Sequence, residues 1–238
     1  MSLGADARTL WQLACGQRAA SSHAARLEAF YRPQAADYDR FRERLLAGRG
    51  ELVTALDIRA GQRVLELGAG TGRNAEFFAP IIPSLTRLTL VDLCPALLEQ
   101  ARARAARWPN CEVIDADATH FQAAGIDRLF MSYALSMMPD WQAVLTNACG
   151  MLAADGLLGV VDFYVAAANP APGLARHAGL TRWFWPRWFG HDGVRLDSAP
   201  LTALRTQLET VHLHEGLARV PYLPGLRVPY FVFVGRRR

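Results

Sequence analysis

The most constraining feature of this 238-residue sequence is the stretch VLELGAGTGRN, residues 64–74. Gly68, Gly70 and Gly72 follow a short apolar run and precede a segment of helical character. A strand that turns into a helix through glycines lets the backbone approach a ligand closely, because no Cβ atoms intervene. Tight strand–helix turns need glycine in any case, so the pattern predicts the local structure and leaves the ligand open.

Apolar runs of strand length alternate with helix-like segments through the middle of the chain. The predicted strands are 63–67, 87–91, 111–114, 129–132 and 157–163, and the predicted helices are 74–78, 95–107 and 141–152, the last ending at a stop turn, ADG. Strands that alternate with helices imply an α/β fold with a mostly parallel, doubly wound sheet, Rossmann-like and three layers thick.

The two ends of the chain differ from this middle part. Residues 1–57 are of helical character and are predicted to form an N-terminal cap, and residues 58–238 are predicted to form one domain. Within that domain, a basic and aromatic insertion at about 164–200 interrupts the alternation. A helix at 200–208 and closing strands at 209–213 and 230–234 are expected to follow.

Composition narrows the chemistry. All 26 basic residues are arginine, so a Walker lysine, a Schiff-base lysine and a Ser–Lys dyad are excluded. The four cysteines form no C-x-x-C pair, and His212 and His214 lack an evident third ligand, so no metal site is expected. No export signal and no apolar run of about 20 residues is present, which leads us to expect a cytoplasmic protein.

The glycine spacing and one acid indicate the kind of ligand. The order is G-x-G-x-G, and Arg73 stands where the dinucleotide fingerprint G-x-G-x-x-G has its last glycine. Glu66, just before the turn, would repel a pyrophosphate at the helix N-terminus and would suit a ligand with a positive centre. S-adenosylmethionine carries both a sulfonium and an ammonium group, so it is the candidate ligand.

Further acids follow the second and third predicted strands. Asp92 lies about 20 residues past the turn, where a carboxylate accepts ribose hydroxyls. Asp117 is placed to accept the adenine amino group, and its neighbour Asp115 competes for that role. Each acid alone is as readily a helix cap or turn residue. Their occurrence in order at the carboxyl ends of successive strands favours a nucleoside site.

Together these segments resemble class I S-adenosylmethionine-dependent methyltransferases over roughly residues 31–163. VLELGAGTG is similar to the first motif of that family, LTLVDLCPALLEQAR to the second, DADAT to the third, and DRLFMSYALSMMPDW with MLAADGLLGVVDFY to the later block. The resemblance implies a methyltransferase that uses S-adenosylmethionine, on a seven-stranded sheet with an antiparallel last strand. It also implies the cofactor-binding set Tyr38, Glu66, Gly68, Ala69, Gly70, Asp92, Leu93, Asp117, Ala118 and Ser132.

A narrower resemblance concerns the methyl acceptor. SYALSMMPDW, VVDFY, LTRWFWPRWFGHDGVRL and VPYLPGLRVPY resemble the methyltransferase part of betaine lipid synthases, which implies N-methylation of an amino-headgroup lipid. Aromatic faces hold methylammonium groups by cation–π attraction, and an arginine fork suits a carboxylate. Ser132, Tyr133 and Tyr31 are the predicted catalytic residues; further candidates are Tyr38, Tyr230, Trp183 and Trp185 for the cation, and Arg182 and Arg195 for the carboxylate.

Other functions stay open on the sequence alone. A methyltransferase for a soluble amine or metabolite is the first alternative, and an NAD-binding oxidoreductase or a non-catalytic nucleotide-binding protein is the second. No nucleic-acid partner is expected, because no basic stripe with interleaved aromatics extends beyond one segment.

That segment, RWFWPRWF at 182–189, has two readings. It either contacts a membrane peripherally at the inner face or packs as a lid, and the lid is favoured, since Trp is usually buried. Residues from 163 onward carry 10 Arg and 4 acids, so this third of the chain would attract something anionic.

Overall fold

The computed structural model describes residues 23–32, 45–190, 194–221 and 225–238, and its framework is a seven-stranded sheet of order β3-β2-β1-β4-β5-β7-β6. The strands are β1 Arg63–Leu67, β2 Arg87–Asp92, β3 Cys111–Asp115, β4 Ile126–Ser132, β5 Leu152–Phe163, β6 Leu208–Arg219 and β7 Arg227–Arg237. Strands β1 to β5 pair in parallel, whereas β7 runs antiparallel between β5 and β6. The predicted fold class, with its antiparallel last strand, is confirmed.

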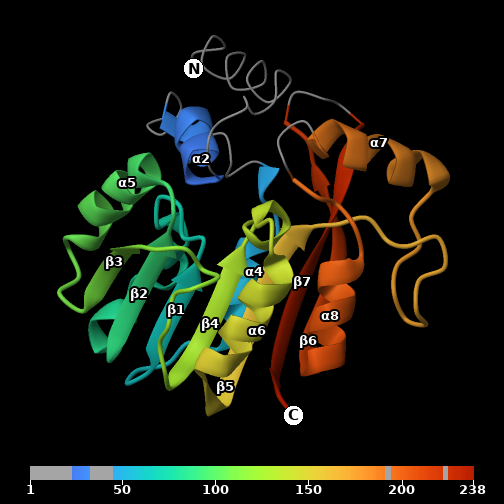
Figure 1. Cartoon of the computed structure of the whole chain (residues 1–238). Coiled ribbons are helices and arrows are strands. Elements are labelled where there is room, and N and C mark those ends of the chain that lie inside the picture. Colours follow the sequence, from blue (N-terminus) through green and yellow to red (C-terminus); the bar gives the residue numbers. More distant parts are fainter. Residues whose placement is uncertain (1–22, 33–44, 191–193, 222–224) are drawn as a thin grey trace.

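Helices cover both faces of the sheet, which gives three layers (Figure 1). The helices are α2 His23–Tyr31, α4 Arg49–Leu56, α5 Pro95–Ala105, α6 Trp141–Met151, α7 Gly179–Gly190 and α8 Ala199–Gln207, with 3₁₀ turns η2 Arg73–Phe78, η3 Ile82–Ser84 and η4 Leu135–Met137. One apolar core joins α4, η2 and α7 to the sheet, and a second joins α6 and α8 to its other face.

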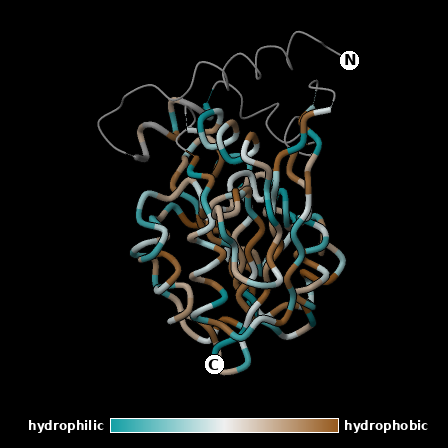
Figure 2. Tube along the Cα trace, turned by 90° about the vertical axis from the view of Figure 1, so that its right-hand side faces the viewer, coloured by the Kyte–Doolittle hydropathy of each residue, from teal (hydrophilic) through white to brown (hydrophobic). Residues whose placement is uncertain are grey.

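The central strands are apolar on both sides because both sides are covered. Four of the five residues of β1 are buried, and so is the run from Val228 to Gly235 in β7. Figure 2 shows the hydrophobic trace running through the strands in the middle of the molecule. Continuous apolar strands of this kind are expected where a sheet is buried on both faces.

Sequence and structure differ at the end of α6. The stop turn predicted at 154–156 is wrong, since these residues lie inside β5, which begins directly after the helix at Leu152. The pairing of β5 with β4 shifts register between Ile126 and Arg128, so the extra residues are taken up by an irregularity in the ladder. At Gly156 a Cβ atom would lie 2.7 Å from the carbonyl oxygen of Ile126, so the glycine serves strand packing.

The carboxyl ends of β1 to β5 meet at one edge of the sheet, where α2 and α7 also lie (Figure 1). Strand β6 runs in the same direction, so the connection from β6 to β7 reaches this edge as well. Tyr38 lies outside the described residues. Within the described ranges, no helix is long and apolar enough to cross a membrane.

Candidate functional site

The glycine turn after β1 folds over the end of β2. The backbone N–H groups of Gly68 and Ala69 both donate to the carbonyl oxygen of Val91, at 2.8 and 3.0 Å. The φ values are 71°, 55° and 69° at Gly68, Gly70 and Gly72, and residues with a Cβ atom rarely adopt such positive values. A Cβ atom on Gly68 would lie 2.4 Å from the Cβ of Ala134, so glycine is required there for space as well.

Asp92, at the end of β2, holds this turn in shape. Its Oδ2 accepts a hydrogen bond from the Gly70 N–H at 2.7 Å, and its Oδ1 accepts one from the Cys94 N–H at 2.9 Å. Burial raises the pKa of Asp92, although these backbone donors oppose the shift. Each carboxylate oxygen keeps a second acceptor site, so ribose hydroxyls can bind in addition.

Of the two acids Asp115 and Asp117 at the end of β3, only Asp117 reaches the cavity. Asp117 lines it, and its Oδ1 accepts a hydrogen bond from the Thr119 N–H at 2.8 Å. Asp115 pairs with Asp92 in the sheet register and does not line the cavity. The geometry therefore favours Asp117 for the adenine end of a nucleoside.

A cavity of about 360 Å³ opens above the carboxyl ends of the strands. The predicted site residues that line it are Tyr31, Gly68, Ala69, Gly70, Asp92, Leu93, Asp117, Ala118, Ser132 and Tyr133. They come from α2 and from the ends of β1, β2, β3 and β4. The topology thus brings together residues spread over about 100 positions, at the place where open α/β sheets bind ligands.

Glu66 is the one described member of the predicted cofactor set that does not line the cavity. It is fully buried at the end of β1, and its Oε1 accepts a hydrogen bond from Asn74 Nδ2 at 2.6 Å. Burial raises the pKa of Glu66 to about 8, so the carboxyl is mostly neutral at pH 7. Glu66 thus contacts the cavity wall through its hydrogen bond with Asn74, which lines the cavity.

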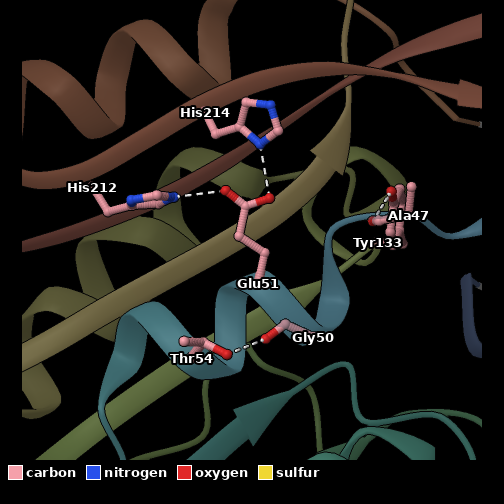
Figure 3. A network of polar contacts seen from close by, with 7 residues as sticks. All are labelled: Ala47, Gly50, Glu51, Thr54, Tyr133, His212 and His214. Atoms are coloured by element: carbon pink, nitrogen blue, oxygen red, sulfur yellow. Dashed lines mark hydrogen bonds and ion pairs between the residues drawn. The ribbon is translucent and has the colours of Figure 1, made fainter.

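Tyr133 is held in a strained conformation directly after β4. Its φ is 54°, which is rare for a bulky residue and typical of sites where geometry is fixed by function. Its N–H donates to the Val161 carbonyl at 2.8 Å, and its hydroxyl donates to the Ala47 carbonyl at 2.6 Å (Figure 3). Burial raises the pKa of Tyr133 well above its ordinary value of 10.

Two more predicted residues face the same space. The hydroxyl of Tyr31 donates to the sulfur of Met137 at 3.3 Å, and its ring lines the cavity from α2. The Oγ of Ser132 is buried and has no hydrogen-bond partner within the described part of the chain. A buried hydroxyl of this kind costs free energy unless a ligand or water pairs with it.

The loop that follows Tyr133 is anchored by Asp162 at the end of β5. Asp162 accepts hydrogen bonds from the Ser136 N–H at 2.8 Å, the Ser136 hydroxyl at 2.7 Å and the Phe163 N–H at 2.8 Å. Burial raises the pKa of Asp162 to about 6 in spite of these donors. Asp162 does not line the cavity; it fixes the loop whose Ala134, Met137 and Met138 do.

The other residues suggested for an acceptor lie elsewhere. Tyr230, Trp183, Trp185, Arg182 and Arg195 do not line the cavity. Among the described residues, the arginines that line it are Arg49 of α4, which is 8% exposed, and Arg73 at the start of η2. Arg73 follows the glycine motif and could have been suspected from sequence, whereas Arg49 is placed by the packing of α4 on β5 and β7.

His212 and His214 bind the same carboxylate. Glu51 of α4 lies between them, with His212 Nε2 2.9 Å from Oε1 and His214 Nδ1 2.7 Å from Oε2 (Figure 3). These contacts tie α4 to strand β6, and with it the helix start that carries Arg49. Among the residues the structure describes, no group of His, Cys, Asp and Glu is arranged to hold a metal ion.

Comparison with known proteins agrees with this geometry. Residues 64–156 match the family model described as "Methyltransferase domain". The trans-aconitate 2-methyltransferase of Enterobacter sp. (strain 638) is 32% identical over 111 residues, which are 46% of this chain and 42% of that protein. The chain spans about half the length of the curated relatives that it matches.

Solved structures share the fold over a longer stretch. The N-methyltransferase NodS from Bradyrhizobium japonicum WM9, in complex with S-adenosyl-L-homocysteine, has a TM-score of 0.65 at 19% identity and covers 89% of this chain and 98% of its own. Phosphoethanolamine N-methyltransferase 2 of Haemonchus contortus has a TM-score of 0.68 at 13% identity, over 92% of this chain and 60% of its own.

The fold and the cavity agree with the match of residues 64–156 to a methyltransferase domain. S-adenosylmethionine is the cofactor that this similarity indicates, and the residues present fit it. Gly68, Ala69 and Gly70 of the turn line the cavity, as do Asp92 and Asp117 at successive strand ends. Within the described part of the chain, the buried hydroxyl of Ser132 has no hydrogen-bond partner.

Proposed function

We propose that the protein transfers a methyl group from S-adenosylmethionine to a neutral amine nitrogen, and that the acceptor is the amino headgroup of a lipid of the betaine type. The choice of an amine as the methyl acceptor rests on the residues that line the cavity. The rings of Tyr31 and Tyr133 line the same space as the glycine turn and the strand-end acids. Aromatic faces attract the cationic nitrogen that forms when an amine is methylated.

When bound, S-adenosylmethionine supplies a methyl group on a positively charged sulfur. The amine nitrogen uses its lone pair to form the new N–C bond while the C–S bond breaks, and the nitrogen then releases a proton to water. The residues that line the cavity orient the amine and exclude solvent. Holding the reacting groups in line in this way lowers the barrier to methyl transfer. Ser132 Oγ is available to pair with the amine, and the Tyr133 hydroxyl, already bonded to Ala47, leaves only its ring for the cation.

Two proteins of similar fold are named N-methyltransferases, which supports nitrogen as the acceptor atom. The relative named trans-aconitate 2-methyltransferase does not support it, because its name specifies no amine acceptor. The lipid headgroup rests on the resemblance of the C-terminal third to betaine lipid synthases. A carboxylate on such a headgroup would suit Arg49 or Arg73, which line the cavity.

A soluble amine is the second candidate. It is favoured by the cavity volume of about 360 Å³, which lies near the lower end of small-molecule sites. Acyl chains of a lipid acceptor would have to stay outside a cavity of this size.

The first test is a calorimetric titration of the protein with S-adenosylmethionine. Micromolar-range binding that is lost in Asp92→Ala and kept in Asp115→Ala is expected, because only the first carboxylate holds the glycine turn. Absence of binding to the intact protein would contradict the proposed function. Transfer of labelled methyl groups is then measured with an amino lipid in mixed micelles and with soluble amines, and activity on the soluble amines alone would select the second candidate.

A further inference from the structure

Helix α7 has apolar residues on two opposite sides. Trp185 and Phe189 are 3% and 9% exposed and pack into the core beneath the helix. Leu180, Trp183 and Trp188 are 74%, 54% and 37% exposed. A lid would bury its apolar side chains. The lid therefore accounts for Trp185 and Phe189, but it does not explain the exposure of Leu180, Trp183 and Trp188.

The exposed residues of α7 form one stripe. Positions 180, 183, 187 and 188 lie on one side of a helix because they are three, seven and eight residues apart. Arg187 belongs to this stripe: its guanidinium lies 4.9 Å from the centre of the Trp183 ring and donates to the Trp183 carbonyl at 2.9 Å. An exposed tryptophan therefore carries an arginine stacked on its face.

The β6–β7 hairpin presents further exposed apolar residues at the same edge of the sheet. Leu217 and Leu226 are 53% and 40% exposed, and Arg219 and Arg227 beside them are exposed too. Val220 of this connection packs against the large core cluster that also holds Trp185 and Phe189. The connection and α7 lie at the same edge of the sheet (Figure 1). We call the set Leu180, Trp183, Trp188, Leu217 and Leu226 the α7–hairpin patch; it holds five of the seven large apolar side chains that are exposed in the described ranges.

Arginines accompany the patch. Arg176, Arg182 and Arg187 belong to α7 and the segment before it, and Arg219 and Arg227 belong to the ends of β6 and β7. Residues 163–238 as a whole carry 10 Arg and 4 acids. Tryptophan and arginine are the residues that sit at a lipid–water interface, with rings at headgroup depth and guanidinium groups toward phosphates. We propose that the α7–hairpin patch docks the protein on the surface of a bilayer that contains anionic lipids.

The patch is one layer of rings away from the cavity. Phe189 of α7 contacts Phe163 at a centroid distance of 5.3 Å, and Phe163 contacts Tyr133 at 4.5 Å. Tyr133 lines the cavity, and the patch lies at the same edge of the sheet (Figure 1). Docking would bring the cavity to the headgroup layer while acyl chains remain in the bilayer. The docking deepens the proposed function, and its use in catalysis rests on the lipid acceptor.

The test is flotation of the full chain with vesicles of phosphatidylcholine, with and without phosphatidylglycerol. Binding to the anionic vesicles is expected, weakened roughly tenfold or more in the double variant Trp183→Ser with Trp188→Ser, because interfacial binding scales with buried apolar area. The matched control is Val211→Ser, which removes a side chain that is 48% exposed on β6 outside the patch and should leave binding unchanged. Quenching of tryptophan fluorescence by brominated lipid should fall in the double variant only.

Absence of binding to anionic vesicles would overturn the docking proposal, and so would equal losses in the double variant and the control. Calorimetric binding of S-adenosylmethionine, which needs no membrane, is measured on the same variants and should stay unchanged. If the vesicles bind the protein but no lipid is methylated, the docking surface stands and the lipid acceptor is wrong.

Discussion

Replacing Glu66 by glutamine tests whether the acid before the glycine turn works as a charge or as a neutral hydrogen-bonding group. Its folded pKa of about 8 lies above the ordinary value of 4.5. The folded state therefore binds a proton that the unfolded state releases, so the stability present below pH 4.5 is lost as the pH rises toward 8. Each pKa unit corresponds to about 1.4 kcal/mol, so wild-type protein should lose about 3 kcal/mol from this group between pH 5 and pH 7.

The Glu66→Gln variant does not titrate, so its free energy of unfolding should shift by about 3 kcal/mol in its favour, relative to wild type, over the same interval. Comparing the two pH values cancels the packing cost of the buried amide, whose nitrogen would occupy the unpaired Oε2 position. The assay is urea denaturation followed by circular dichroism at both pH values. Glu112→Gln is the control, because Glu112 is exposed and pairs with Arg87 on the neighbouring strand.

A gap between variant and wild type that does not change with pH would refute the buried, neutral carboxyl. Calorimetry adds a second readout, because glutamine should preserve binding of S-adenosylmethionine if Glu66 acts only through Asn74. Loss of binding at pH 7 would instead show that an ionised carboxylate faces the cofactor, as the sequence suggested.

Three further substitutions test the cavity wall. Gly68→Ala should destabilise the protein by about 3 kcal/mol and abolish cofactor binding, because alanine is strained at this positive φ and its Cβ would clash with Ala134. Gly61→Ala is the control: its φ is also positive but its surroundings are open, so thermal denaturation should show a cost of only about 1–2 kcal/mol. Tyr133→Phe should retain methyl transfer but raise the KM for the cofactor in steady-state kinetics, because the hydroxyl donates its hydrogen bond to the Ala47 carbonyl. A large fall in kcat with unchanged KM would instead indicate that the hydroxyl oxygen takes part in the chemistry. Asp162→Ala should lower the free energy of unfolding by about 3 kcal/mol or more, measured in urea, since it leaves three buried donors unpaired.

The sheet and its strand-end acids were predictable because they depend on short-range patterns. Strand β1 was predicted with its observed limits, and β2 was one residue longer than predicted. Parallel strands force their carboxyl ends to one edge, so Asp92 and Asp117 could be assigned to one site without knowing any distance.

Depth and long-range packing could not be predicted in this way. Glu66 was expected to face a ligand. Whether a side chain at a strand end points into the cavity or beneath the turn depends on how the following helix starts. Here the chain continues as the 3₁₀ turn η2, and Asn74 of this turn lies within hydrogen-bonding distance of Glu66. Arg49 reaches the cavity from α4, a helix that packs on β5 and β7 and that Glu51 ties to two histidines about 160 residues away in sequence. No local pattern records such a contact.

The strain at Tyr133 suggests how the cavity and the segment before α4 depend on each other. A bulky residue with φ of 54° costs about 1–3 kcal/mol, and the structure must hold it there. Two hydrogen bonds do so, one from its N–H to β5 and one from its hydroxyl to Ala47, just ahead of α4. Glu51 fixes the same helix to β6 from the other side. The shape of the cavity wall at Tyr133 is therefore set jointly by the end of β4 and by α4, and a change that loosens α4 should release the strain and alter the cavity without touching any lining residue.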